Sequence, residues 1–106
     1  MNFNGTASNS SFTLANGGIR AELNVSSVTN HGNGDYEAHF ANNLDDANYV
    51  VSIIGGYDDG TNHYVYGSLK DQTANPSASS VRFVTALPHS PWRDDCEFVS
   101  VIIFGS

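Results

Sequence analysis

Apolar side chains recur at every second position along much of this chain, and no segment repeats them with the 3.6-residue period of a helix. From Ile19 to Val25 they alternate with arginine, glutamate and asparagine, and the segment from Tyr36 to Phe40 alternates in the same way. A strand with this pattern turns one face to a core and the other to water. Residues 29–35, which lie between the two segments, are rich in asparagine and glycine and predict a hairpin loop.

The remaining strands are predicted from the same pattern and from the turn residues that separate the apolar runs. One short strand is expected around Phe12 and Leu14, and others over residues 49–54, 63–69, 81–87 and 98–104. Residues 42–48 have room for one helical turn at most. About seven short antiparallel strands predict one all-β domain over residues 1–106, a small β-sandwich or barrel, of which we favour the antiparallel β-sandwich.

The last predicted strand, within the sequence CEFVSVIIFGS, is apolar on both of its faces. A single sandwich of this size buries one face of such a strand and leaves the other without cover. Exposed contiguous apolar area normally marks an interface, so we predict an oligomer in which Val99, Val101 and Ile103 contact a neighbouring copy. The alternative is a central strand whose second face is covered by a loop of the same chain.

Composition narrows the possible partners. The formal net charge is −7, and the only cationic side chains are Arg20, Lys70, Arg82 and Arg93. Binding to nucleic acid or to an anionic membrane surface requires a broad basic face, which four cations do not provide. No apolar run is long enough to cross a bilayer. We therefore expect neither nucleic-acid binding nor membrane insertion, and the single cysteine, Cys96, excludes an intrachain disulfide.

The segment YDDGTNHY, residues 57–64, is the richest polar cluster. Asp58 and Asp59 carry oxygens of the kind that calcium binds, although their spacing is not that of an EF-hand. Tyr57 and Tyr64 offer flat rings on which a sugar can stack, and His63 lies beside them in the sequence. These five residues form one candidate binding site, and the alternative is an ordinary polar hairpin.

The segment PHSPWRDD, residues 88–95, contains the only tryptophan of the chain. A rigid, exposed indole suits sugar recognition because it covers the C–H face of a sugar with little loss of side-chain entropy. Trp92 and Arg93 are therefore further candidate binding residues. Trp92 fits a place in the core or in a subunit contact equally well, and Arg93 fits a surface ion pair with the aspartates that follow it.

Catalysis is not expected. Acidic pairs occur at positions 45–46, 58–59 and 94–95, but adjacent residues of a strand point to opposite faces, so none of these pairs forms a two-carboxylate glycosidase site unaided. The four histidines are dispersed and lack the spacing of a metal site within one chain. We therefore expect no enzyme activity, no cofactor and no metal. Copies of one histidine around an oligomer axis remain an alternative route to a metal.

Three parts of the chain resemble a module of bacteriophages: NFNGT near the start, IRAELNVSSVTNHGNGDYEAHFANNLDDANYVVS in the first half, and VSVIIFG at the end. They are similar to the C-terminal domain of tail fibres that are common in marine and other tailed phages and prophages. The matching elements are, in order, residues 24–29, 32–36, 46–49 and 104–105. Residues 7–18 and most of the stretch from 57 to 95 have no counterpart in this pattern.

The resemblance implies a homotrimer whose distal domains recognise the bacterial surface. It implies a place in the virion, at the tip of a fibre outside the host cell, and a chain that is a piece of a longer fibre. Because the domain is acidic, a neutral glycan or an outer-membrane protein is a better receptor than an anionic polymer. Two alternatives stay open: a monomeric carbohydrate-binding module of a larger enzyme, and a purely structural trimerisation or capping domain.

Overall fold

The computed structural model describes residues 1–5, 10–21, 23–57, 64–70, 76–86, 95 and 99–105. These residues contain nine strands and no helix. They therefore contain no helix that is long and apolar enough to cross a membrane. Neighbouring strands run antiparallel throughout. The strands are β1 (Asn2–Phe3), β2 (Ser11–Phe12), β3 (Ile19–Ala21), β4 (Val25–Gly32), β5 (Asp35–Phe40), β6 (Val50–Tyr57), β7 (Tyr64–Leu69), β8 (Ser80–Ala86) and β9 (Val99–Phe104).

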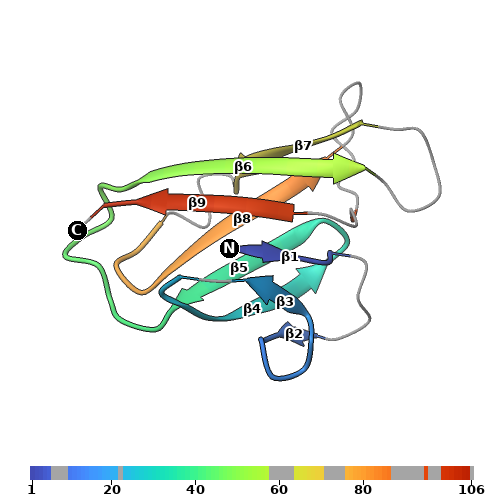
Figure 1. The fold of residues 1–106 in the computed structure, drawn as a ribbon. Coiled ribbons are helices and arrows are strands. Elements are labelled where there is room, and N and C mark those ends of the chain that lie inside the picture. The colour runs from blue at the N-terminus through green and yellow to red at the C-terminus, as the bar shows by residue number, and fades with distance from the viewer. Residues whose placement is uncertain are drawn as a thin grey trace.

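All nine strands belong to one hydrogen-bonded sheet in the order β2-β4-β5-β8-β7-β6-β9-β1-β3. β6, β7 and β8 form a meander and β5 lies beside β8, which is a Greek-key arrangement. The N-terminal strand β1 lies between β9 and β3 (Figure 1). The edge strands β2 and β3 follow each other in the chain, and the Ile19 N–H donates to the Thr13 carbonyl over 3.1 Å. The sheet therefore curls until it nearly closes into a barrel (Figure 1).

The predicted all-β, antiparallel fold is confirmed. The described strands are connected into one curled sheet, as in a barrel. A division into two separate sheets, as in a sandwich, is not seen among them. β5 and β8 occupy the segments predicted for them, with alternate side chains buried. Residues 42–48 contain no helical turn.

The predicted strand from Ile19 to Val25 is wrong as one element, because the chain breaks it into β3 and β4. Asn24 adopts a left-handed backbone conformation with φ 58°, which a continuous strand does not contain. Leu23 beside it is 88% exposed, although the alternation predicts it in the core. β4 then continues to Gly32, so the predicted loop over residues 29–35 shortens to Asn33 and Gly34, an Asn-Gly hairpin turn with Gly34 at φ 64°.

The core is centred on Phe3, a residue of the two-residue strand β1. Its ring packs edge-on against Tyr36 at a centroid distance of 5.0 Å and stacks on Phe12 at 5.6 Å. Phe83 on β8 completes this aromatic group. Burial of these rings and of the aliphatic side chains around them supplies the main driving force for folding. The buried apolar residues are Phe3, Phe12, Ile19, Val25, Val28, Tyr36, Ala38, Phe40, Val81, Phe83, Val99 and Val101.

The antiparallel register gives the barrel two different ends. At the end that we call the hairpin end, the Asn33–Gly34 turn lies beside the last residues of β8 and the first residues of β9 lie beside the end of β6. At the opposite end, which we call the far end, β5 finishes at Phe40 and β9 finishes at Phe104. The two ends of the barrel therefore bring together different segments of the chain.

Candidate functional site

The strands that flank the predicted binding segments all reach the hairpin end. β6 ends at Tyr57 and β7 begins at Tyr64, and these two residues are paired across the ladder. β8, which leads toward Trp92, ends at Ala86 on the same side of the sheet. The other predicted binding residues, Asp58, Asp59, His63, Trp92 and Arg93, lie outside the described residues.

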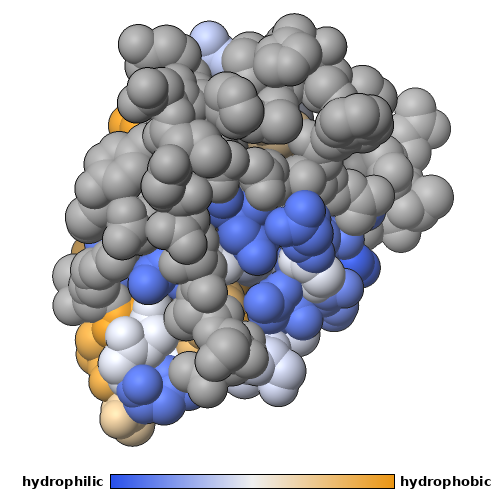
Figure 2. All heavy atoms as spheres, turned by 90° about the vertical axis from the view of Figure 1, so that its right-hand side faces the viewer, coloured by the Kyte–Doolittle hydropathy of each residue, from blue (hydrophilic) through white to orange (hydrophobic). Residues whose placement is uncertain are grey.

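One carboxylate ties the connection between β8 and β9 to this end. Asp95 Oδ1 accepts hydrogen bonds from the Gly34 N–H at 2.7 Å and from the Tyr36 hydroxyl at 2.5 Å. The Asp95 N–H donates to Asn33 Oδ1 over 3.2 Å, and the Tyr36 hydroxyl also lies 3.0 Å from the Gly5 carbonyl. Figure 2 faces this end and shows hydrophilic side chains gathered at its centre. Asp95, three positions after Trp92 in the sequence, therefore joins three distant parts of the chain.

An ionic cluster lies on the outer face of β5 and β8. Arg82 binds Asp35 in a bidentate manner, with Nε 3.1 Å from Oδ1 and Nη2 3.0 Å from Oδ2. Lys70 Nζ lies 3.4 Å from Asp35 Oδ2, and the Asp35 side chain is buried. Burial alone raises the pKa of Asp35, but the hydrogen bonds and positive charges of Arg82 and Lys70 together hold that pKa below 3.8. Asp35 is therefore an ionised structural anchor.

A second polar cluster continues across the same face toward β4. Glu37 accepts hydrogen bonds from the Ser80 hydroxyl at 2.7 Å and from His31 Nε2 at 2.9 Å. Burial raises the pKa of Glu37, but these two donors and the histidines His31 and His39 outweigh it and hold the pKa below 4.5. His39 Nε2 is in turn 2.8 Å from the Thr29 hydroxyl. Because these groups bind one another across β4, β5 and β8, the cluster stabilises the sheet.

The structure corrects the choice of interface residues on the last strand. Val99 and Val101, predicted to contact a neighbouring copy, are buried in the core of the single chain. Ile103 lies on the same side of β9 and is half-buried. The outward side chains are those of Ser100, Ile102 and Phe104, because successive residues of a strand face opposite ways. Ile102 is 61% exposed and Phe104 is 79% exposed.

These outward residues belong to a larger group that we call the apolar stripe. Phe104 pairs with Val50, Ile102 pairs with Ser52, and Ile54 pairs with both Ser100 and Tyr66. The stripe crosses the outer face of β9, β6 and β7, and its side chains carry no formal charge. Its exposed apolar members are Val50, Ile54, Tyr66, Ile102 and Phe104.

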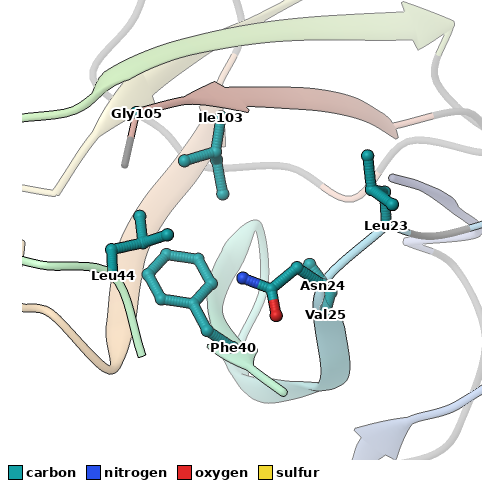
Figure 3. A pocket seen from close by; sticks show the side chains of 7 residues that line it. All are labelled: Leu23, Asn24, Val25, Phe40, Leu44, Ile103 and Gly105. Atoms are coloured by element: carbon teal, nitrogen blue, oxygen red, sulfur yellow. The ribbon is translucent and has the colours of Figure 1, made fainter. Parts of the chain in front are cut away.

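A pocket of 160 Å³ opens on the other side of β9, at the far end (Figure 3). Ile103 points from β9 toward Phe40 and Leu44, and Leu23 closes one side (Figure 3). A neighbouring pocket of 230 Å³ shares Leu23 and Ile103 and extends to Met1. The first pocket is lined by Leu23, Asn24, Val25, Phe40, Leu44, Ile103 and Gly105, none of which is charged. Its lining is mainly apolar.

The described residues contain no group of three or more His, Cys, Asp or Glu side chains that could hold a metal ion. Comparison of the chain with known protein families, curated proteins and solved structures found no match. The function must therefore be argued from the residues and their arrangement.

Sequence reasoning missed Ile102 and Phe104, although a signal for them is present. Ser100 is the polar residue of the last strand and marks its outer face. The same parity places Ile102 and Phe104 beside it, and Val99 and Val101 in the core. The pocket has no comparable signal, because Leu23 and Ile103 lie far apart in the sequence and line one pocket only in the folded chain.

Proposed function

We propose that this chain is the distal domain of a bacteriophage or prophage tail fibre, which assembles as a homotrimer and recognises a receptor on the bacterial surface. The resemblance over residues 24–29, 32–36, 46–49 and 104–105 suggests the class of protein. The antiparallel barrel is compatible with it, because such a sheet is a rigid support on which variable connections carry the binding groups.

The observation that carries the proposal is the separation of two kinds of surface. The strand ends that flank residues 58–63 and 87–94 lie at the hairpin end, where Asp95 is hydrogen-bonded to Gly34 and Tyr36. The apolar stripe lies on the outer wall instead, over β9, β6 and β7. A fibre tip needs such a division, since one surface must face the receptor while another holds the subunits together.

The receptor that fits best is a neutral glycan or an exposed loop of an outer-membrane protein. With a net charge of −7, the domain repels anionic polymers at long range. Tyr57, Tyr64 and Trp92 would supply stacking surfaces, and Asp58, Asp59, His63 and Arg93 would supply hydrogen bonds. Three copies on one fibre would strengthen weak single-site binding by raising the effective concentration of the remaining sites.

The first test is the mass of the domain in solution together with its adsorption to candidate host cells. We expect a trimer that binds cells and that competes with the intact phage. Trp92→Ala and Tyr57→Ala should abolish adsorption while the trimer and its circular dichroism spectrum stay unchanged. Ser68→Ala, an exposed change on β7, serves as the control.

The outcomes separate the proposal from its alternatives. A folded trimer that binds no host cell would indicate a structural capping domain. A monomer that binds soluble oligosaccharides would indicate a carbohydrate-binding module. Adsorption that survives both aromatic substitutions would overturn the assignment of the binding residues.

A further inference from the structure

β9 carries an exposed aromatic side chain and borders a pocket at almost the same position along the strand. Phe104 projects from its outer face, with 79% of its surface exposed. The preceding residue, Ile103, turns to the opposite side and lines the pocket of 160 Å³. One chain therefore has a projecting side chain, Phe104, which we call the knob, and a pocket on the opposite face of the same strand. Both lie at the far end of the barrel.

The pocket exists because β1 pairs with only the first part of β9. β1 pairs with Val99 and Ser100, and the backbone of Met1 then exchanges hydrogen bonds with Val101. The pocket of 230 Å³ extends beside Met1 and continues toward Ile103. Within the described part of the chain, the space beside the last residues of β9 is thus bordered by apolar side chains and not filled by a paired strand.

We propose that Phe104 of one copy inserts into this pocket of the next copy. A cavity of about 150 Å³ lined by leucine, isoleucine and phenylalanine binds benzene, so a pocket of 160 Å³ with a similar lining is large enough for a phenyl ring. Phe104, which offers that ring, is the most exposed of the large apolar residues of the far end that belong to a strand.

The absence of formal charge on both surfaces allows a second copy to be the occupant. Copies with a net charge of −7 repel one another, and an interface between them must avoid bringing carboxylates together. Neither the residues that line the pocket nor those of the apolar stripe carry a formal charge. The carboxylates Asp35 and Glu37 lie on a different wall, over β5 and β8. Asp45 and Asp46 directly follow Leu44 in the chain but do not line the pocket.

The knob and the pocket are different surfaces of the chain, so the contact is heterologous. A heterologous contact repeats from copy to copy and closes into a ring when the rotation between copies allows it. This step rests on the homotrimer of the proposed function, in which three identical insertions would complete the ring. The stripe residues Val50 and Ile102, next to Phe104, would be covered by the same neighbour.

Two substitutions at exposed positions test the contact from its two sides. Phe104→Ala removes the knob and keeps the pocket. Leu23→Asp places a charge at the mouth of the pocket and keeps the knob, and Leu23 is too exposed for its loss to affect folding. Leu14→Asp, at an exposed leucine in the turn after β2, is the matched control.

The masses are measured by analytical ultracentrifugation, with circular dichroism to confirm folding. We expect each of the two variants to associate at least roughly 30-fold more weakly, as for an interface hot spot, and the control to remain a trimer. An equimolar mixture of the two variants should form a 1:1 dimer, because one intact knob then meets one intact pocket and the ring cannot close.

A trimer that persists in Phe104→Ala, or in Leu23→Asp, would overturn this contact and leave the trimeric fibre standing. A monomeric wild-type protein would overturn the proposed assembly itself. A mixture that stays monomeric while both variants are folded would show that knob and pocket do not meet.

Discussion

Arg82 and Asp35 form a bidentate ion pair across β8 and β5, with nitrogen–oxygen distances of 3.1 and 3.0 Å. Asp35 is buried at the hairpin end, next to the turn that receives Asp95. The pair therefore stabilises the wall of the barrel at the hairpin end.

Removal of Arg82 should lower stability, because it leaves the buried Asp35 carboxylate without its main partner. We expect Arg82→Ala to lower the free energy of unfolding by about 2–3 kcal/mol at neutral pH, as measured by urea denaturation. Lys70→Ala should cost less, since Lys70 makes a single contact at 3.4 Å. Equal losses for both variants would contradict the dominant role of the bidentate pair.

Acid should destabilise the fold through the same carboxylates. The pKa values of Asp35 and Glu37 are lower in the folded chain than their ordinary values of 3.8 and 4.5. The folded state then binds protons less readily than the unfolded state, so the stabilisation is complete above about pH 4.5 and is lost as the pH falls through the folded pKa values. Urea midpoints measured from about pH 6 to about pH 3 should fall. The fall should be smaller in Asp35→Asn, and an unchanged slope would argue against Asp35.

Tyr36→Phe tests the junction at Asp95. The change removes the hydroxyl that contacts Asp95 and the Gly5 carbonyl, and it keeps the ring that packs on Phe3. We expect a loss of about 1–2 kcal/mol in unfolding free energy and faster hydrogen exchange at the Gly34 amide. Tyr49→Phe is the matched control, because its hydroxyl contacts the Ser77 and Ser80 carbonyls away from this junction. It should leave the Gly34 amide unchanged.

Gly67→Ala tests the packing of β7 on β6. A Cβ atom at Gly67 would lie 2.0 Å from Cγ2 of Ile53, so the strands would have to move apart. We expect a loss of about 1–3 kcal/mol, as for other overpacked positions. Adding Ile53→Ala, which removes Cγ2, should not recover all of it, because the Cβ of residue 53 is also too close, at 2.6 Å. A Gly67→Ala variant as stable as the wild type would show that the sheet accommodates the methyl group.

How far the sequence predicts this fold differs between segments. The alternation from Tyr36 to Phe40 predicts β5 correctly, because its polar residues lie on a solvated outer wall. The alternation from Ile19 to Val25 is misleading, because the backbone turns at Asn24. Phe3, at the centre of the core, has no periodic neighbours that would mark it.

For the candidate site, residues 57–64 and 88–95 can be proposed from composition alone. That their flanking strands reach one end of the barrel follows only from the order of the strands. The two faces of β9 are hard to tell apart from the sequence because Ile102 and Phe104 are as apolar as Val99 and Val101, and Ser100 alone marks the outer face. The burial of Val99 and Val101 shows which face packs on the core.

The position of β1 between β9 and β3 also determines when the protein can fold. Met1 and Val101 are hydrogen-bonded although 100 positions separate them in the chain. During synthesis, β1 and β6 therefore wait for their common neighbour, β9, until nearly the whole of this sequence has left the ribosome. The sheet cannot be completed before that time, so its closure and any association that needs β9 belong to the period after translation of the domain.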